Sequence, residues 1–416
     1  MTGRAAAWAG RLLVALAACA ATIAAVGPAR ARALAPPSLA VRAAALIEES
    51  SGDQLYGRDS TAQVAIASTT KLMTALVTLH HATLDDVFTD PNYYPAAEDS
   101  QIGLVPGERM TVRDLLTAML LPSADDAAED LAYNVGHGSV SRFLGWMNAR
   151  ARELGLTHTH YTTPIGLDTP GNYSSAGDLV KLARYLFQTE PFFKATVART
   201  HAVLRTGNHV RSVTNLNELV GRVPWVNGVK TGHTLDAGYV LLASGTKDGM
   251  TLFDVVLGTS SESARDSNAL ALLDWGFANY GMRTPVHAGA VLARPAVTDV
   301  MGKHVRLLAA SSYTHVFAKA EKVRLRVNAP AQLTGPLPAH SVVGSVAVVA
   351  GRRVVARIPL LTASQLPQIK HSRSIASAVV VSVTLFGLLV AAGAAIGLTM
   401  FWRELTRGRG GRSTPR

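Results

Sequence analysis

The sequence predicts an α+β fold, and two patterns in residues 38–282 support this prediction. Strand-like segments stand at both ends of this region, and helix-like segments fill its middle from about 68 to 200. Strands at the two ends of a domain commonly pair in one sheet, with the intervening helices packed against it. We therefore expect an antiparallel sheet covered by helices.

The strands of this region are predicted from local patterns. Residues 39–60 read as a β-hairpin that turns near Gly52–Asp53. Residues 226–259 contain successive apolar runs separated by Gly and Asp, which is typical of consecutive strands. These two segments are expected to meet in the sheet.

The sequence predicts a buried helix and a last helix in this region. A helix that begins at Ser68 is apolar on most sides through Leu79, so it is expected to run through the core. A last helix is expected over residues 262–281, where Gly281 ends it.

The pattern changes after Thr284–Pro285 to strands alone. The segment "KVRLRVNA" alternates strictly, and "SVAVVAGRRVVARIPLL" reads as a hairpin that turns at Gly351–Arg352. Residues 285–368 are therefore expected to form a small, separate β-rich domain. No motif that carries chemistry stands out there, so a stalk or spacer is its simplest role.

Residues 1–33 have the features of a secretory signal peptide. Arginines precede an apolar stretch over residues 12–26, and small residues at 29, 31 and 33 fit a cleavage site. The only cysteine, Cys19, lies in this segment, so the mature chain would have no thiol and no disulfide. A lipoprotein cleavage box at "LAAC" is an alternative, which the apolar run continuing past Cys19 disfavours.

Residues 375–402 contain no charged side chain, which predicts a transmembrane anchor. A helix of this length spans about 40 Å, more than the roughly 30 Å hydrocarbon core of a bilayer. The basic tail at 403–416 is expected to be cytoplasmic, although Lys370 and Arg373 on the other flank weaken this signal. The body of the protein would then lie on the extracytoplasmic side of a bacterial cell membrane.

The formal net charge of +11 does not indicate nucleic-acid binding, because it is concentrated at the two ends. Residues 1–33 contribute four positive charges and residues 403–416 a net of four, which leaves +3 for the middle. The motif "HTH" at 158–160 offers two metal ligands and no apparent third. Neither a metal nor a cofactor is expected.

A serine and a lysine three residues apart open the buried helix. Ser68 and Lys71 would share one helix face. The helix dipole and a low dielectric would both lower the pKa of Lys71, and a neutral lysine could take the proton of the Ser68 hydroxyl. Taken alone, the pair favours a simpler interpretation, a capping serine and a lysine that reaches solvent.

Two further motifs follow along the chain. In "LLPSADD", Ser123 and Asp125 would lie in the connection between two helices, where Ser and Asp also commonly cap the second helix. In "VNGVKTGHT", Lys230 and Thr231 would end a strand, and Gly232 would let a ligand approach the backbone closely.

The three motifs together, S-x-x-K, S-A-D and K-T-G in this order, are specific. With "GLVPGERMTVRDLL" and "MNARARELGLTHTHYTTPIGLDTPGNYSSAGDL", they make the chain resemble the D-alanyl-D-alanine carboxypeptidases of low-molecular-mass penicillin-binding type, serine peptidase family S11. The resemblance covers roughly residues 38–282. It implies a penicillin-binding and β-lactamase-like catalytic domain, for which a following β domain and a C-terminal anchor are usual.

The resemblance implies roles for individual residues. Ser68 would attack the carbonyl between two D-alanines of a peptidoglycan stem peptide and form an acyl-enzyme, with Lys71 as its base. Ser123 would relay a proton to the leaving amine. Lys230 would bind the terminal carboxylate, and the residues beside it would complete the substrate site: Asp125, Thr231, Gly232 and His233. The backbone N–H groups of Ser68 and His233 would form the oxyanion hole. β-Lactams would acylate Ser68 as inhibitors.

The sequence departs from the family pattern at Asp125, where Asn is usual. An Asn amide donates a hydrogen bond that an ionised Asp cannot donate. An ionised Asp125 near Lys71 would also raise the pKa of the lysine and oppose its role as base. We therefore predict reduced turnover, or activity in a state in which Asp125 shares or holds a proton.

The sequence leaves three alternatives to a carboxypeptidase. A DD-endopeptidase would use the same site on cross-linked peptidoglycan. A catalytically weakened wall-binding protein would fit Asp125, but it would not explain why the other motif residues are intact. A β-lactamase is disfavoured, because no E-x-x-L-N stretch lies between the second and third motifs.

Overall fold

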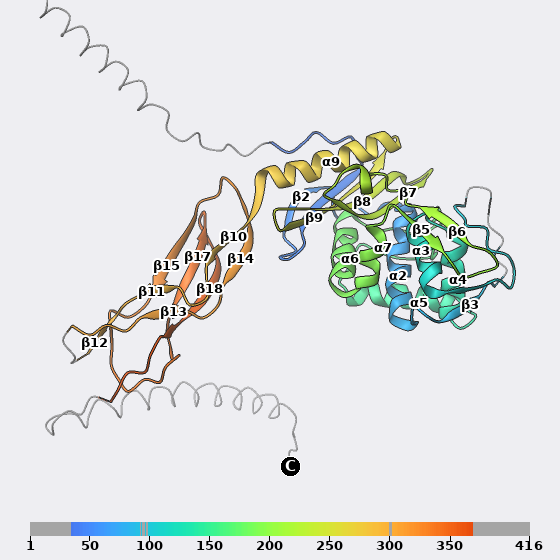
Figure 1. Cartoon of the computed structure of the whole chain (residues 1–416). Coiled ribbons are helices and arrows are strands. Elements are labelled where there is room, and N and C mark those ends of the chain that lie inside the picture. The colour runs from blue at the N-terminus through green and yellow to red at the C-terminus, as the bar shows by residue number, and fades with distance from the viewer. Residues whose placement is uncertain (1–34, 92, 94–95, 97–98, 299–301, 369–416) are drawn as a thin grey trace, which may run out of the picture. The chain divides into compact units, whose positions relative to one another are not determined.

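The computed structural model of the protein describes residues 35–91, 93, 96, 99–298 and 302–368 (Figure 1). The predicted signal peptide (1–33), anchor (375–402) and tail (403–416) lie outside the described residues. Among the residues that are described, no helix is both long enough and apolar enough to cross a bilayer.

The described chain forms two compact units. Among the described residues, the larger unit contains those up to Val286 together with 312–325 and 348–356, and the smaller contains those of 287–311, 326–347 and 357–368. The domain boundaries that we drew from the sequence at 282 and 285 remain predictions.

A five-stranded antiparallel sheet is the centre of the larger unit. Its strand order is β2-β1-β9-β8-β7. The strands are β1 (Ala43–Glu48), β2 (Gln54–Arg58), β7 (Val226–Thr234), β8 (Gly238–Lys247) and β9 (Met250–Thr259). The predicted hairpin at 39–60 therefore pairs with the later strands, and the predicted α+β class is confirmed.

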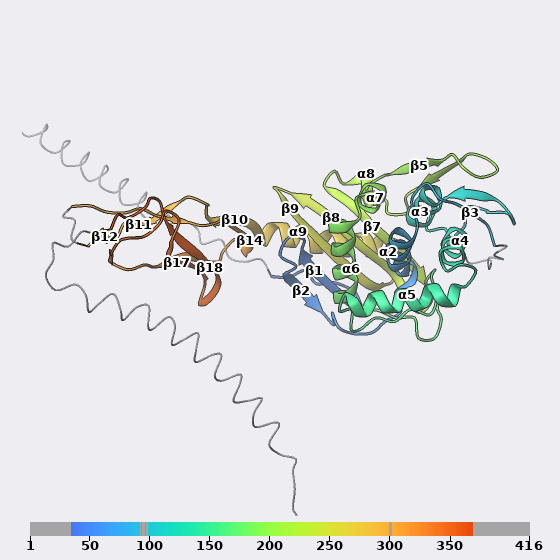
Figure 2. The ribbon, with the colours of Figure 1, turned by 90° about the horizontal axis from the view of Figure 1, so that it is seen from below.

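Helices cover both faces of this sheet (Figure 2). One face packs against a helical layer formed by most of the segment between β2 and β7, and the other packs mainly against one long helix, α9 (Glu262–Asn279). The helical layer consists of η1 (Ala67–Thr70), α2 (Lys71–His81), α3 (Val112–Leu120), α4 (Asp125–Val135), α5 (Val140–Glu153), α6 (Ala176–Thr189) and α7 (Pro191–Val197).

Alternation along β9 explains the two apolar layers. Phe253 and Val255 belong to the core under the helical layer, and Leu252 and Val256 belong to the core under α9. A central strand that is buried on both faces is expected to be apolar at successive positions. Asp254 interrupts this run inside the strand, whereas Asp236 and Asp248 lie between strands, as predicted for the aspartates that separate the apolar runs.

Smaller elements complete the larger unit. Two short antiparallel pairs lie among the helices, and a third follows α9. These elements are β3 (Val87–Thr89) with β4 (Arg109–Thr111), β5 (His201–Leu204) with β6 (Arg211–Thr214), α8 (Leu219–Arg222), and β10 (Tyr280–Val286) with β14 (Tyr313–Ala318).

The remaining C-terminal strands form a second five-stranded sheet in the order β11-β13-β18-β17-β15. They are β11 (Val291–Ala293), β13 (Leu307–Ala309), β15 (Val323–Asn328), β17 (Val342–Ala350) and β18 (Arg353–Thr362), with β12 (Ala296–Val297) and β16 (Gln332–Leu333) as a parallel pair beside them. The predicted hairpin at Gly351–Arg352 is confirmed as β17 and β18. The alternating segment β15 is an edge strand, and nearly all of its residues are exposed.

Candidate active site

Ser68 and Lys71 lie at the junction of two helical segments. The α-helix begins at Lys71, and Ser68 lies in the preceding 3₁₀ turn, so our prediction that the helix begins at Ser68 was wrong by one turn. The Lys71 Nζ donates a hydrogen bond of 2.9 Å to the Ser68 Oγ. The first eight residues of α2 are all buried, as predicted.

Lys71 is fully buried and has three polar contacts. Besides Ser68, its Nζ lies 2.5 Å from Asp125 Oδ1 and donates to the carbonyl oxygen of Ile165 at 2.9 Å. Burial is the largest influence and lowers the pKa of Lys71, while the negative charge of Asp125 partly opposes it. Desolvation, one of the two causes predicted from the sequence, is therefore the largest influence on this pKa.

Asp125 is the first residue of α4 and does not cap it. The N-cap is Ala124, which makes no side-chain cap hydrogen bond. The Asp125 carboxylate contacts Lys71 through one oxygen and accepts the backbone N–H of Ser100 through the other, at 3.0 Å. Burial raises the pKa of Asp125, and Lys71 lowers it. Burial thus favours the neutral form of both partners.

Ser123 lies in the connection between α3 and α4, as predicted. Its backbone has φ of +66°, in the left-handed region that non-glycine residues rarely adopt. Its hydroxyl is buried and has no hydrogen-bond partner among the described residues. Backbone strain and an unpaired buried hydroxyl both occur at functional sites, where a ligand supplies the missing partner.

The K-T-G motif lies inside β7, the edge strand of the sheet, and does not end the strand as we predicted. Lys230 is buried, and its Nζ donates to the carbonyl oxygen of Thr231 at 2.9 Å. Burial lowers the pKa of Lys230, and the nearby charge of Lys71 lowers it further. The two lysines are therefore close enough to repel each other electrostatically.

Gly232 brings β7 against the turn that carries Ser68. A Cβ at this position would lie 2.9 Å from both the Ser68 backbone nitrogen and the Ala67 Cβ. Only glycine permits such an approach. The next residue, His233, is exposed and stacks on Tyr239 with 4.0 Å between ring centroids.

Two acidic residues near Lys71 escaped our sequence analysis. Glu129 lies one turn after Asp125 on α4, and burial followed by the charges of Asp125 and Asp99 raises its pKa to about 7. Both Asp99 and Glu129 raise the pKa of Lys71. The i,i+4 spacing of Asp125 and Glu129 could have indicated that they share a face of α4.

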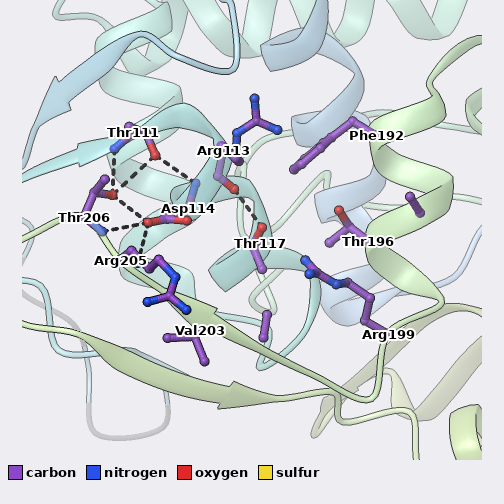
Figure 3. Close-up of a pocket in the computed structure, with 12 residues that line it drawn as sticks. Thr111, Arg113, Asp114, Thr117, Phe192, Thr196, Arg199, Val203, Arg205 and Thr206 are labelled. Carbon is purple, nitrogen blue, oxygen red and sulfur yellow. Dashed lines mark hydrogen bonds between the residues drawn. The ribbon is translucent and has the colours of Figure 1, made fainter.

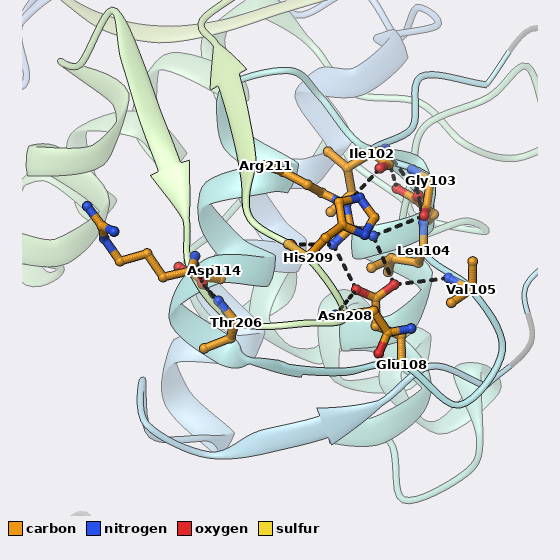
Figure 4. Close-up of polar contacts among 12 residues, drawn as sticks. Ile102, Gly103, Leu104, Val105, Glu108, Asp114, Thr206, Asn208, His209 and Arg211 are labelled. Carbon is orange, nitrogen blue, oxygen red and sulfur yellow. Dashed lines mark hydrogen bonds and ion pairs between the residues drawn. The ribbon is translucent and has the colours of Figure 1, made fainter.

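A network of carboxylates holds the segment that covers Asp125. The buried Asp126 accepts backbone N–H bonds from Ile102, Gly103 and Leu104 at 2.9–3.2 Å. Glu108 pairs with Arg211 at 2.7 and 2.9 Å, and the Arg211 guanidinium also donates to the carbonyls of Ile102 and Gly103 (Figure 4). This network fixes the backbone next to Ser100, which donates to Asp125.

A family model described as D-alanyl-D-alanine carboxypeptidase, peptidase family S11, matches residues 30–261, more than half of the chain. The chain belongs to this family. The resemblance drawn from the three motifs is thereby confirmed, as is the prediction of a serine-type D-Ala-D-Ala carboxypeptidase.

Individual relatives agree with the family match. The carboxypeptidase DacF of Bacillus subtilis is 29% identical over 77% of this chain and 84% of its own. DacB2 of Mycobacterium tuberculosis is 36% identical over 55% of this chain and 79% of its own. Penicillin binding protein 6B from Escherichia coli superimposes with a TM-score of 0.64 at 28% identity, covering 80% of this chain and 98% of its own. Its penicillin-binding-protein fold is therefore shared by this S11 carboxypeptidase.

Proposed function

We propose that Ser68 is the nucleophile of this carboxypeptidase and that its substrate is a peptidoglycan stem peptide ending in D-Ala-D-Ala. The observation that carries this proposal is the 2.9 Å contact between the Ser68 Oγ and the buried Lys71 Nζ. A serine hydroxyl needs an adjacent base to become an effective nucleophile.

The acylation step follows from this contact. The Ser68 Oγ bonds to the carbonyl carbon between the two D-alanines while its proton passes to neutral Lys71. The peptide C–N bond then breaks, and the departing amine of the terminal D-alanine takes a proton through the Ser123 hydroxyl. Water later cleaves the ester, which frees Ser68 and leaves a carboxylate on the shortened peptide.

The edge of β7 supplies the proposed substrate contacts. The Lys230 ammonium would pair with the terminal carboxylate of the substrate, beside Thr231. The close approach of Gly232 to Ser68 supports an oxyanion hole formed by the backbone N–H groups of Ser68 and His233. Asp125 would face the substrate from the opposite side.

D-alanine release from a diacetyl-Lys-D-Ala-D-Ala peptide tests this proposal. The full chain should release D-alanine, and Ser68→Ala should abolish release. Ser174→Ala, a buried serine outside the three motifs, is the matched control and should retain activity. Release that persists in Ser68→Ala would overturn the assignment. Incubation with penicillin tests the same serine, because a covalent mass increase should occur in the parent and not in Ser68→Ala.

The predicted membrane anchor belongs to the same proposal. The uncharged stretch at 375–402 and the basic tail after it support tethering, with the catalytic unit on the extracytoplasmic side. The full chain should sediment with membranes and resist extraction by high salt, and a chain ending at residue 368 should be released. Equal release of both chains would contradict the anchor.

A further inference from the structure

A cavity of about 650 Å³ lies away from the proposed catalytic residues, between α3, α7 and β5 (Figure 3). None of the residues of the three motifs lines it. Its volume is within the roughly 300–1,000 Å³ typical of small-molecule sites. The cavity is open to solvent, so a segment of a larger molecule could enter it.

Three arginines surround this cavity. Arg113 belongs to α3, Arg199 follows α7, and Arg205 follows β5. All three are exposed. Figure 3 shows Arg199 extending toward Thr117 and Thr196 at the centre of the lining. Arginines from three separate segments therefore line the same cavity.

The arginines are not neutralised by the protein. In the described part of the chain, the guanidinium groups of Arg199 and Arg205 have no hydrogen bond or ion pair with a protein group. Arg113 has an ion pair of 3.0 Å with Asp85, but the Asp85 side chain is 87% exposed, and such pairs are weak. Most of the positive charge is thus available to a ligand.

The one acidic residue in the lining, Asp114, is hydrogen-bonded to the protein. Its Oδ2 accepts the backbone N–H groups of Arg205 and Thr206 and the Thr206 hydroxyl, at 2.7–2.9 Å. These bonds tie the end of β5 to the first turn of α3 and so fix the position of Arg205. The Asp114 carboxylate therefore stabilises the wall of the cavity and forms no ion pair with the guanidinium groups of the three arginines.

The cavity also has an aromatic side. The Arg113 guanidinium carbon lies 5.7 Å from the centre of the Phe192 ring. This contact holds the guanidinium beside an apolar surface, on which the C–H face of a sugar ring could pack. Guanidinium groups beside an aromatic ring suit a ligand that carries both sugar rings and oxyanions.

We propose that this cavity is a second binding site, which holds an anionic cell-wall glycopolymer through its carboxylate or phosphodiester groups. Its ligand is distinct from the D-Ala-D-Ala terminus that the catalytic site takes. Binding here would keep the enzyme on the polymer between successive cleavages. The inference rests on the proposed function only in placing the protein at the cell wall.

Cosedimentation with insoluble peptidoglycan sacculi tests the site. Ser68→Ala serves as the parent in detergent, so that neither turnover nor acylation affects the measurement. Arg199→Gln with Arg205→Gln should raise the Kd at low salt at least about tenfold, because two charge-assisted contacts are lost. The matched control, Arg152→Gln with Arg294→Gln, removes two exposed arginines elsewhere and should bind as the parent does. Raising the salt should weaken parent binding and reduce the difference.

Sacculi stripped of phosphodiester-linked polymers by hydrofluoric acid distinguish the two sources of charge. If binding is retained, the ligand groups are the carboxylates of peptidoglycan. If binding is lost, the ligand is a phosphodiester polymer. Equal binding by the Arg199→Gln, Arg205→Gln variant and the parent would overturn the proposal. So would a control variant whose binding is weakened as much as that of the Arg199→Gln, Arg205→Gln variant. The catalytic proposal is tested independently, by D-alanine release from a short peptide by the unmodified protein.

Discussion

The ammonium nitrogen of Lys71 lies 2.5 Å from a carboxylate oxygen of Asp125, and both side chains are almost inaccessible to water, with 0% and 6% exposure. Burial lowers the pKa of Lys71 and raises that of Asp125, so desolvation reduces the difference between the two pKa values. This matters for catalysis, because Lys71 can accept the Ser68 proton only when it is neutral.

Replacing Asp125 with Asn is expected to increase kcat for D-alanine release about tenfold near pH 7. The substitution removes the negative charge that opposes deprotonation of Lys71, and each pKa unit changes the neutral fraction of a mostly charged lysine about tenfold. The Asn amide can also donate a hydrogen bond to substrate. Steady-state kinetics on the diacetyl-Lys-D-Ala-D-Ala peptide measure the gain.

Asp130→Asn is the matched control for Asp125→Asn. Asp130 is also a buried acid of α4, but its carboxylate accepts from Asn134 and does not contact Lys71. Asp130→Asn should leave kcat close to that of the parent. An Asp125→Asn protein that folds normally and shows no gain would disprove our account of the departure from the family motif.

We expect kcat/KM to rise with pH as Lys71 loses its proton. Asp125→Asn should move this ascending limb to lower pH, because the lysine no longer has an adjacent anion that raises its pKa. Glu129→Gln should move it in the same direction by less, since Glu129 has a smaller influence on the pKa of Lys71. Rate profiles over roughly pH 5 to 10 measure both shifts. A limb that stays in place in both variants would mean that another group controls the rate.

The local features of this site were predictable from sequence, and those that depend on packing were not. Ser68 and Lys71 are three residues apart, so any helical turn brings them together. The contact between Lys71 and Asp125 joins residues 54 positions apart and requires α2 to pack against α4. The spacing within each motif contains no information on this distance, and only the family resemblance suggested it.

Two further differences have the same cause. The sequence predicts that Lys230 and Thr231 end a strand, whereas β7 continues to Thr234 and uses Gly232 for its approach to Ser68. The arginine-lined cavity escaped detection because Arg113 and Arg199 lie on segments that become neighbours only in the folded protein.

Gly232→Ala is expected to lower kcat/KM about 100-fold, the size of effect seen when an oxyanion-hole donor is lost. The added Cβ would lie 2.9 Å from the Ser68 backbone nitrogen, so β7 must move away from the nucleophile. The acylation rate with penicillin should fall in parallel. Gly145→Ala is the control, because a Cβ there meets nothing within 4 Å on α5, and its activity should be unchanged. Full activity in Gly232→Ala would show that this close approach does not position the donors.

Asp254→Asn is expected to stabilise the protein at alkaline pH and to have little effect near pH 4. Asp254 is fully buried on β9, opposite Leu46 of β1 and Ala243 of β8. No other described residue donates a hydrogen bond to its carboxyl oxygens. Burial raises its pKa well above the usual value of 3.8, so the folded protein retains a proton that the unfolded chain releases.

The sign of this effect follows from proton binding. Below the ordinary pKa of an aspartate, both the folded and the unfolded protein carry the proton, and Asp254 does not make stability depend on pH. As the pH rises above that value, folding must take up a proton, which lowers the free energy of unfolding by up to about 1.4 kcal/mol per pH unit until the folded-state pKa is reached. Asparagine has no such proton. Thermal unfolding of parent and Asp254→Asn proteins between roughly pH 4 and 8 should therefore give Tm values that diverge by several degrees toward the upper end. The exposed Asp274→Asn should show no such divergence, and parallel Tm curves for Asp254→Asn and the parent would mean that Asp254 is ionised in the folded protein.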